Sequence, residues 1–224
     1  MIILSGLIYH PVIADPYLED DLGLWSPIYL EAPITERILG KFEVNSRIQE
    51  NITHINQLIV RPSIGYKLNK NLSIWQGYGW NTFYIPRFLR EQRLWNQILH
   101  EKEFSKLSLV NRFRFEERFI QDVEGVSLRA RYLLRGLYPI GKTKRWGIAL
   151  SDELFVNLNS HFNGPQAGID QNRFFIGINR KLSNHADLEG GYQLQYINAN
   201  RPKVDKLNHI ILISLYIYLP QILK

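Results

Sequence analysis

The stretch LSLVNRFRFEER at residues 107–118 decides which fold class this sequence predicts. Within it, Phe113 and Phe115 alternate with Arg112 and Arg114. Side chains of a β-strand point alternately to the two faces of a sheet, so this order places the aromatic rings on one face and the guanidinium groups on the other. Helical spacing would mix the two sets. The stretch therefore predicts a strand with one apolar and one charged face.

The same alternation recurs along the chain and predicts an all-β protein. It is clear in VSLRARYLLRGLY at residues 126–138. Further segments repeat it at residues 39–49, 58–68, 72–84, 146–158, 172–182, 186–197 and 207–219. Two segments are weaker, because Pro27 interrupts residues 22–32 and because residues 93–103 also fit one helical face.

The number of strands is constrained by barrel closure. We count about eleven segments from Leu22 onward, whereas bacterial single-chain membrane barrels contain an even number of strands. We therefore expect one weak segment to be misread, or a further strand to lie near the N-terminus. The prediction is an antiparallel up-and-down transmembrane β-barrel of about 10 to 12 strands.

The links between the segments alternate between tight and longer ones. The tight links lie at residues 32–36, 67–71, 138–145 and 181–185, and the longer ones at 50–56, 85–92, 120–125, 159–171 and 198–208. In an up-and-down barrel, this alternation places short turns at one rim and loops at the other.

Strand pairing also limits which charged residues meet. Paired strands must present the same face to each side of the sheet. Around the tight turn at residues 181–185, this rule brings Lys181 opposite Asp187. For the two arginine-rich segments it leaves few neighbours for Glu116, namely Ser127, Arg129 or Arg131.

The overall composition narrows the class of protein. The chain has 224 residues, 45% of them hydrophobic, a formal net charge of +6 and a mean hydropathy of −0.20. This apolar content is too high for a disordered chain, and no run of ~18 apolar residues predicts a transmembrane helix. The absence of cysteine excludes disulfides, thiolate metal sites and cysteine nucleophiles. A membrane barrel is compatible with this composition, because the mean hydropathy of strands with alternating polarity is close to that of a soluble protein.

The first residues, MIILSGLIYHPVIA at 1–14, are mostly apolar and end in Val12-Ile13-Ala14. This pattern favours a signal peptide that is truncated at its start, because no Lys or Arg precedes the apolar run. The alternative is an extra N-terminal strand. Residues 15–224 are expected to form a single barrel domain.

The charged face indicates what the sheet encloses. A soluble barrel packs apolar groups inside, whereas a membrane barrel gathers its charges in the lumen. The arginines interleave with apolar residues along strands rather than forming a surface patch, which argues against nucleic acid as a partner. We expect a lumen, either a pore or an internal salt-bridge network, that is lined by Lys41, Glu43, Arg47, Arg112, Arg114, Glu116, Arg118, Arg129, Arg131, Arg135, Glu153, Asp187 and Glu189.

Aromatic residues recur on the apolar face, many of them near strand ends. Rings with a polar tip favour the lipid–water interface of a membrane barrel, although sheets are enriched in aromatic residues in general. We expect an interfacial belt that is formed by Tyr66, Trp80, Tyr132, Tyr138, Trp146 and Tyr192.

Metal and hydrolytic chemistry have little support in the sequence. The six histidines are dispersed, and no two are spaced for a shared metal on one strand face, so neither a metal nor another cofactor is expected. Ser160 and His161 lie together in a long link, which motivates a hydrolase at the barrel rim. Adjacent residues of an extended chain point to opposite faces, however, so this motif is weak.

The order of several motifs resembles one bacterial family. The motifs are DLGLW at residues 21–25, GYKLNKNL at 65–72, RLWNQ at 93–97, NRFRFEER at 111–118 followed by LRARY at 128–132, and NRF at 172–174 leading to Lys181-Leu182. In this order they resemble the domain-of-unknown-function family numbered twenty-four ninety, over most of residues 21–219. The resemblance implies an outer-membrane β-barrel and implies no catalytic residue.

The predicted function is that of a non-enzymatic outer-membrane barrel. Its lumen forms either a narrow pore that prefers anions, since rings of cationic side chains favour anions, or a structural barrel that is packed shut. The expected partners are outer-membrane lipids and small anionic solutes. Two alternatives stay open: an outer-membrane lipid-modifying hydrolase with a site at the rim, and a soluble β-barrel that binds an apolar ligand inside.

Overall fold

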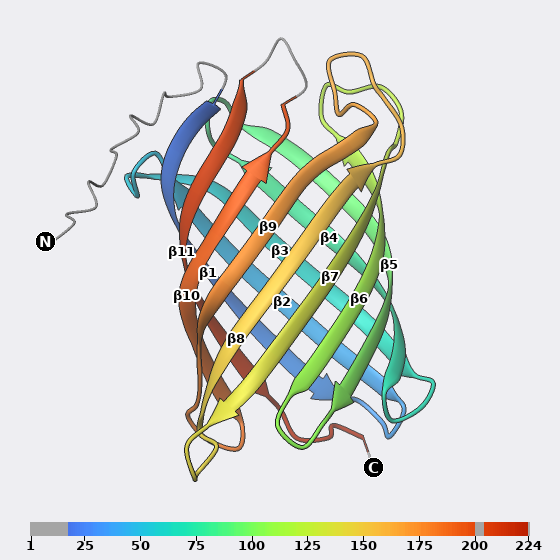
Figure 1. Cartoon of the computed structure of the whole chain (residues 1–224). Coiled ribbons are helices and arrows are strands. Elements are labelled where there is room, and N and C mark those ends of the chain that lie inside the picture. Colours follow the sequence, from blue (N-terminus) through green and yellow to red (C-terminus); the bar gives the residue numbers. More distant parts are fainter. Residues whose placement is uncertain (1–17, 200–203, 224) are drawn as a thin grey trace, which may run out of the picture.

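The computed structural model describes residues 18–199 and 204–223, and within them the regular structure is entirely β (Figure 1). Eleven strands close into one barrel, so the predicted all-β barrel is confirmed. The strands are β1 (Leu18–Pro33), β2 (Ile38–Gln49), β3 (His54–Lys67), β4 (Leu72–Phe83), β5 (Leu89–Glu103), β6 (Ser108–Ile120), β7 (Ser127–Ile140), β8 (Trp146–Asn157), β9 (Gly168–Lys181), β10 (Ala186–Ile197) and β11 (Asp205–Tyr218). The expectation of a signal peptide or a strand at residues 1–14 lies outside the described residues.

In the described residues the barrel has eleven strands, within the predicted 10 to 12, whereas the even number expected for a single-chain bacterial barrel is not met. Both weak segments are strands, because residues 22–32 lie in β1 and residues 93–103 lie in β5. Consecutive strands pair antiparallel, so in an odd set the first and last strands run in the same direction. The barrel consequently closes through a parallel pair between β1 and β11. Register at this seam skips Ser26 and Pro27, and a proline has no N–H to donate to a ladder.

The predicted cross-strand neighbours are confirmed. Glu116 of β6 lies directly opposite Arg129 of β7. Lys181 of β9 lies opposite Asp187 of β10. The register therefore brings side chains of opposite charge to the same face of the sheet, which stabilises these pairings.

The two ends of the barrel differ in their links. One end, the turn end, carries the links at residues 34–37, 68–71, 104–107, 141–145 and 182–185. The other end, the loop end, carries the links at 50–53, 84–88 and 121–126, the longest described link at 158–167, and the link after β10. The predicted alternation is thus present but smaller than expected, because β3 and β5 begin earlier than the sequence pattern indicated. The chain returns at the turn end, where the Leu219 and Ile222 amides donate to the carbonyls of Glu31 and Pro33.

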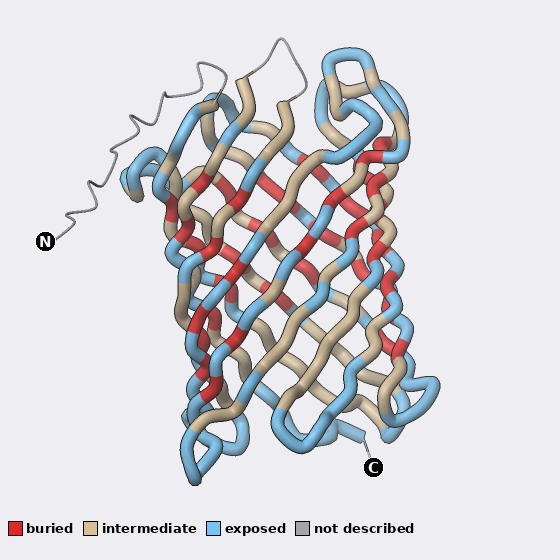
Figure 2. The backbone as a smooth tube through the Cα atoms, viewed as in Figure 1, coloured by how far each residue is buried: buried red, intermediate tan, exposed pale blue. Residues whose placement is uncertain are grey.

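Burial alternates along the strands (Figure 2), with polar groups inside the barrel and apolar groups outside. Most of the buried side chains are polar or charged, including Glu91, Glu116 and Glu189, which are each at most 2% exposed. The outer wall is covered by apolar residues such as Ile28 and Ile64, whose side chains are about half exposed. This distribution is the inverse of a soluble protein and is typical of barrels that lie in lipid.

Aromatic rings also point inward, although the expected lumen lining did not include them. Trp75 and Trp95 are at most 7% exposed, and glycines of neighbouring strands make room for them. A Cβ at Gly65 would lie 2.5 Å from the Trp75 ring, and one at Gly77 would lie 2.1 Å from Cζ2 of Trp95. These glycines therefore allow indole rings to lie flat against the inner wall, where they fill space between the charged groups.

Candidate functional site

A dense set of ion pairs covers one side of the lumen, on β5 to β8. At its centre, Glu116 is 1% exposed and accepts hydrogen bonds from Arg129 and from Arg131, both at 2.6 Å. Glu153 of β8 accepts from Arg131 at 2.7 Å and from Arg112 at 2.6 Å. Buried charges are tolerated only when they are paired and hydrogen-bonded, and here every carboxylate contacts at least two guanidinium groups.

The same side of the lumen continues toward the loop end through Glu91. Its carboxylate binds Arg93, two residues along β5, and Arg118 across the strand pair on β6, both at 2.6 Å. Period-two spacing places Glu91 and Arg93 on the same face, and the register of β5 with β6 sets Arg93 opposite Arg118. We call the following set the ion-pair cluster: Glu91, Arg93, Arg112, Glu116, Arg118, Arg129, Arg131 and Glu153.

Two further arginines, Arg47 of β2 and Arg173 of β9, are held by aromatic contacts without a direct ion pair to any described residue. The guanidinium carbon of Arg47 lies 3.7 Å from the centre of the Trp25 ring, and that of Arg173 lies 5.0 Å from it. Arg173 also lies 4.5 Å from the ring of Phe155. Such cation–π contacts stabilise a desolvated guanidinium but do not neutralise its charge. We call Trp25, Arg47 and Arg173 the Trp25 stack.

The Trp25 stack lacks acidic partners. Arg47 donates to the side-chain oxygen of Gln57 at 2.8 Å, and Arg173 donates to that of Gln171 at 3.0 Å. Among the described residues, no carboxylate lies within 4.0 Å of either guanidinium, in contrast to Arg61, which reaches Glu43 at 3.3 Å. The lumen therefore contains arginines in direct ion pairs and arginines without one, although Glu153 lies opposite Arg173 in the register of β8 with β9.

Two chambers divide the interior. The turn-end chamber has a volume of about 450 Å³, and the loop-end chamber one of about 220 Å³. Five residues line both chambers and so mark their boundary, which we call the central layer: Trp25, Arg47, Arg61, Arg131 and Arg173. The Trp25 stack thus lies where the two chambers meet.

In the described part of the chain, the charged side chains that line the loop-end chamber are all arginines, and five of them also pair with carboxylates that lie behind the lining. The chamber is lined by seven arginines, namely Arg47, Arg61, Arg93, Arg118, Arg129, Arg131 and Arg173. Among the described residues, no carboxylate lines it. Its other polar lining consists of the neutral amides of Gln49, Asn56, Gln57, Gln171 and Gln195. The chamber is therefore suited to attract anions from the loop end.

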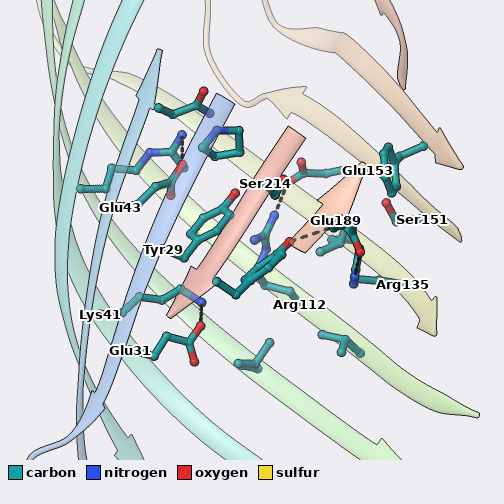
Figure 3. A pocket seen from close by; sticks show the side chains of 18 of the residues that line it. Tyr29, Glu31, Lys41, Glu43, Arg112, Arg135, Ser151, Glu153, Glu189 and Ser214 are labelled. Atoms are coloured by element: carbon teal, nitrogen blue, oxygen red, sulfur yellow. Dashed lines mark hydrogen bonds and ion pairs between the residues drawn. The ribbon is translucent and has the colours of Figure 1, made fainter. Parts of the chain in front are cut away.

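The turn-end chamber is mixed in charge (Figure 3). Seven carboxylates line it, namely Glu31, Glu43, Glu101, Glu103, Glu153, Asp187 and Glu189. Several are paired in Figure 3: Lys41 with Glu31, Arg135 with Glu189, and Arg112 with Glu153. The stacked rings of Tyr29 and Tyr216, 4.8 Å apart, narrow the space further. The lining of the lumen is therefore asymmetric, with arginines and amides toward the loops and carboxylates toward the turns.

All of the side chains expected to line a lumen lie inside the barrel. Most of them line one of the two chambers, and Glu116 lies buried among the arginines that it binds. The prediction missed several inward side chains, which are Trp25, Arg61, Trp75, Glu91, Arg93, Trp95, Asp170 and Arg173. For Arg173 a signal was present, because it shares the inward phase of β9 with Phe175 and Gly177. Trp75 and Trp95 carried the same kind of signal, because they share the phase of Ser73 and Gly77 on β4 and of Arg93 and Gln97 on β5.

The aromatic residues expected to form a belt all lie on the outer wall, with side chains 36–47% exposed. Three of them, Tyr66, Tyr138 and Trp146, lie at the turn end, and Trp80 lies toward the loop end. Tyr132 and Tyr192 lie at mid-strand, where the hydroxyl of Tyr132 donates to Asn111 at 2.9 Å and that of Tyr192 lies 2.6 Å from Nδ1 of His209. These two satisfy their hydroxyls within the wall rather than at a rim.

The loop-end link at 158–167 does not assemble a hydrolytic pair from Ser160 and His161. The Ser160 hydroxyl accepts from the amide of Ala167 at 2.9 Å, and Nε2 of His161 lies 3.1 Å from the carbonyl of Val126. Both side chains therefore organise the link and its neighbour. In the described parts of the chain, no group of three or more histidine and carboxylate side chains is placed to hold a metal ion, and no helix is long and apolar enough to cross a membrane.

Comparisons with known proteins identify the family. An uncharacterized protein from Methylorubrum extorquens is 33% identical over 181 residues, which cover 78% of each chain. The crystal structure of the siderophore receptor PirA from Pseudomonas aeruginosa matches 74% of this chain and 32% of its own, with a TM-score of 0.27 and 13% identity; this chain therefore spans about a third of that receptor. Residues 22–206 match the model of the family described as Protein of unknown function (DUF2490). The chain belongs to this DUF2490 family.

Proposed function

We propose that the protein is a non-enzymatic outer-membrane barrel whose narrow lumen admits small anions in preference to cations. The observation that carries this proposal is the loop-end chamber, in which seven arginines and no described carboxylate face the enclosed space. A cationic lining in a low-dielectric wall raises the local concentration of anions and repels cations.

The outer wall supports a membrane location. Apolar side chains cover it, while charges collect inside, and this is the arrangement that lipid requires of a barrel. The outward rings of Tyr66, Tyr138 and Trp146 lie at the turn end, where a lipid–water boundary would favour them. Outer-membrane lipids are therefore the partners proposed for this surface.

The central layer limits what can pass. Trp25 is 4% exposed and lies between the two chambers in contact with Arg47 and Arg173. A solute that enters the loop-end chamber must move these side chains before it reaches the carboxylates of the turn-end chamber. We therefore propose that the central layer limits the conductance to a low value and that the arginines of the loop-end chamber set the anion preference.

Planar-bilayer recordings test the proposal. Purified folded protein is expected to give small conductance steps with a reversal potential on the anion side in a potassium chloride gradient. Trp25→Ala is expected to increase the conductance, whereas Trp146→Ala on the outer wall, the matched control, leaves it unchanged. A cation-side reversal potential contradicts the anion preference. If the folded protein gives no conductance steps, the pore is contradicted and a structural barrel is supported. If the protein is recovered from cells in a soluble extract without detergent, the membrane location is contradicted.

A further inference from the structure

We infer that the central layer holds a binding site for a phosphate-class oxyanion, between the guanidinium groups of Arg47 and Arg173 at the floor of the loop-end chamber. The inference deepens the proposed function, because it assigns a ligand to the same lumen. It differs in requiring saturable occupancy of one position, whether or not ions pass through the barrel.

The first argument is that Arg47 and Arg173 form no direct ion pair among the described residues. Arg47 and Arg173 contact the same indole ring, so two like charges lie close together in the interior. Their side-chain acceptors are the neutral amides of Gln57 and Gln171. The carboxylate nearest in register, Glu153 opposite Arg173, is bound by Arg112 and Arg131, and the neighbouring guanidinium adds repulsion. An anion at this position neutralises both groups at once.

The second argument is that hydrogen-bond donors at the same place have no acceptor. Nε1 of Trp25, Nε of Arg47 and Nε of Arg61 are buried without a partner among the described residues. They come from three consecutive strands, β1, β2 and β3, and their side chains line both chambers. Because buried donors are nearly always paired in folded proteins, a group that offers several acceptors is the complement that this layer lacks.

The third argument concerns the shape of the ligand. A guanidinium presents a planar fork of donors that matches the oxygens of phosphate and carboxylate groups. Arginines of the central layer and of the chamber wall come from several strands around one space, which suits a tetrahedral oxyanion with acceptors in every direction better than a planar carboxylate. The chamber volume of about 220 Å³ accommodates a small anion with a few waters. The ligand class is therefore a phosphate group, either free or as part of a lipid headgroup.

Titration calorimetry on the full folded chain, in a non-ionic detergent and a phosphate-free buffer, tests the site. Inorganic phosphate is expected to bind saturably, more weakly as chloride rises. Arg47→Gln and Arg173→Gln are each expected to weaken binding at least about tenfold, since each removes hydrogen bonds to a charged group. The matched control is Arg180→Gln, because Arg180 lies on the same strand as Arg173 and stacks on Trp146, 4.8 Å from its centre, on the outer wall.

Folding is checked for every variant by gel mobility before and after heating. If a glutamine variant fails to fold, Arg47→Lys and Arg173→Lys replace it; they keep the charge but lose the planar fork, and an intermediate loss of affinity is expected. A second titration with a short-chain phospholipid distinguishes the source: binding of phosphate alone indicates the free ion, and binding of both indicates that a headgroup also enters.

Several results would overturn the inference. Heats that do not saturate, or equal affinities for wild type, Arg47→Gln and Arg180→Gln, would show that phosphate has no site in the central layer. The proposed function is judged separately by conductance. A barrel that conducts anions without saturable phosphate binding would refute the site alone, and a barrel that binds phosphate without conducting would refute the pore alone.

Discussion

The ion-pair cluster and the Trp25 stack hold the same kind of residue in opposite ways. In the cluster, Arg129 and Arg131 share Glu116, with N–O distances of 2.6 Å. In the stack, Arg47 and Arg173 share an indole ring and have no carboxylate partner among the described residues. The lumen thus has one part in which arginines are bound directly by carboxylates and another in which they have no direct ion pair. The first part is expected to stabilise the barrel, and the second to set its interaction with anions.

The largest expected effect comes from breaking the cluster at its centre. Glu116→Gln removes the charge that compensates Arg129 and Arg131, and loss of one member of a buried network costs about 3–5 kcal/mol. We expect urea unfolding in vesicles, followed by tryptophan fluorescence, to show this loss in the free energy of unfolding. Glu117→Gln is the control, because Glu117 is the next residue on β6 and points outward. Equal stability of the two variants would contradict a structural role for the cluster.

A smaller effect on stability is expected from the stack. Arg173→Gln removes contacts with the rings of Trp25 and Phe155, which are worth up to about 2 kcal/mol when desolvated. It also relieves repulsion with Arg47, so the net change is expected to be well below that of Glu116→Gln. The same unfolding assay checks it. A loss as large as that of Glu116→Gln would remove the distinction between the two regions.

The smallest effect is expected on the outer wall. Arg180→Gln removes a single cation–π contact with the exposed ring of Trp146, which is worth about 0.5–1 kcal/mol. The free energy of unfolding is expected to change by no more than this amount, and the reversal potential is expected to stay unchanged. A marked change in anion preference would show that outward arginines at the turn end, and not the lumen alone, determine the selectivity.

The sequence predicted the cluster better than the stack. Strict alternation in residues 107–118 and 126–138 placed the arginines on one face, and the rule that paired strands share a face brought Glu116 to Arg129. Trp25 follows no such rule, because its inward position depends on the phase of a strand that Pro27 interrupts. Its contacts join β1 to β2 and β9, and no local pattern records pairing over that distance.

The strand number shows a second limit of the sequence. The sequence pattern indicates strands at residues 22–32 and 93–103, but the expectation of an even strand number counts against one of them. The parallel closure between β1 and β11 depends on a pairing between the two ends of the barrel. Period-two alternation does not say whether two strands run parallel or antiparallel. Only the three-dimensional structure could show that β1 and β11 pair in parallel.

The most direct test of the division between the two regions is the reversal potential of the double variant Arg47→Gln/Arg173→Gln in a potassium chloride gradient, recorded beside wild type on protein whose folding has been checked. The account predicts that the anion preference falls markedly in the double variant although the barrel stays folded with its ion-pair cluster intact. An unchanged reversal potential in the folded double variant would contradict it, because the arginines without a direct ion pair would then have no part in selecting anions.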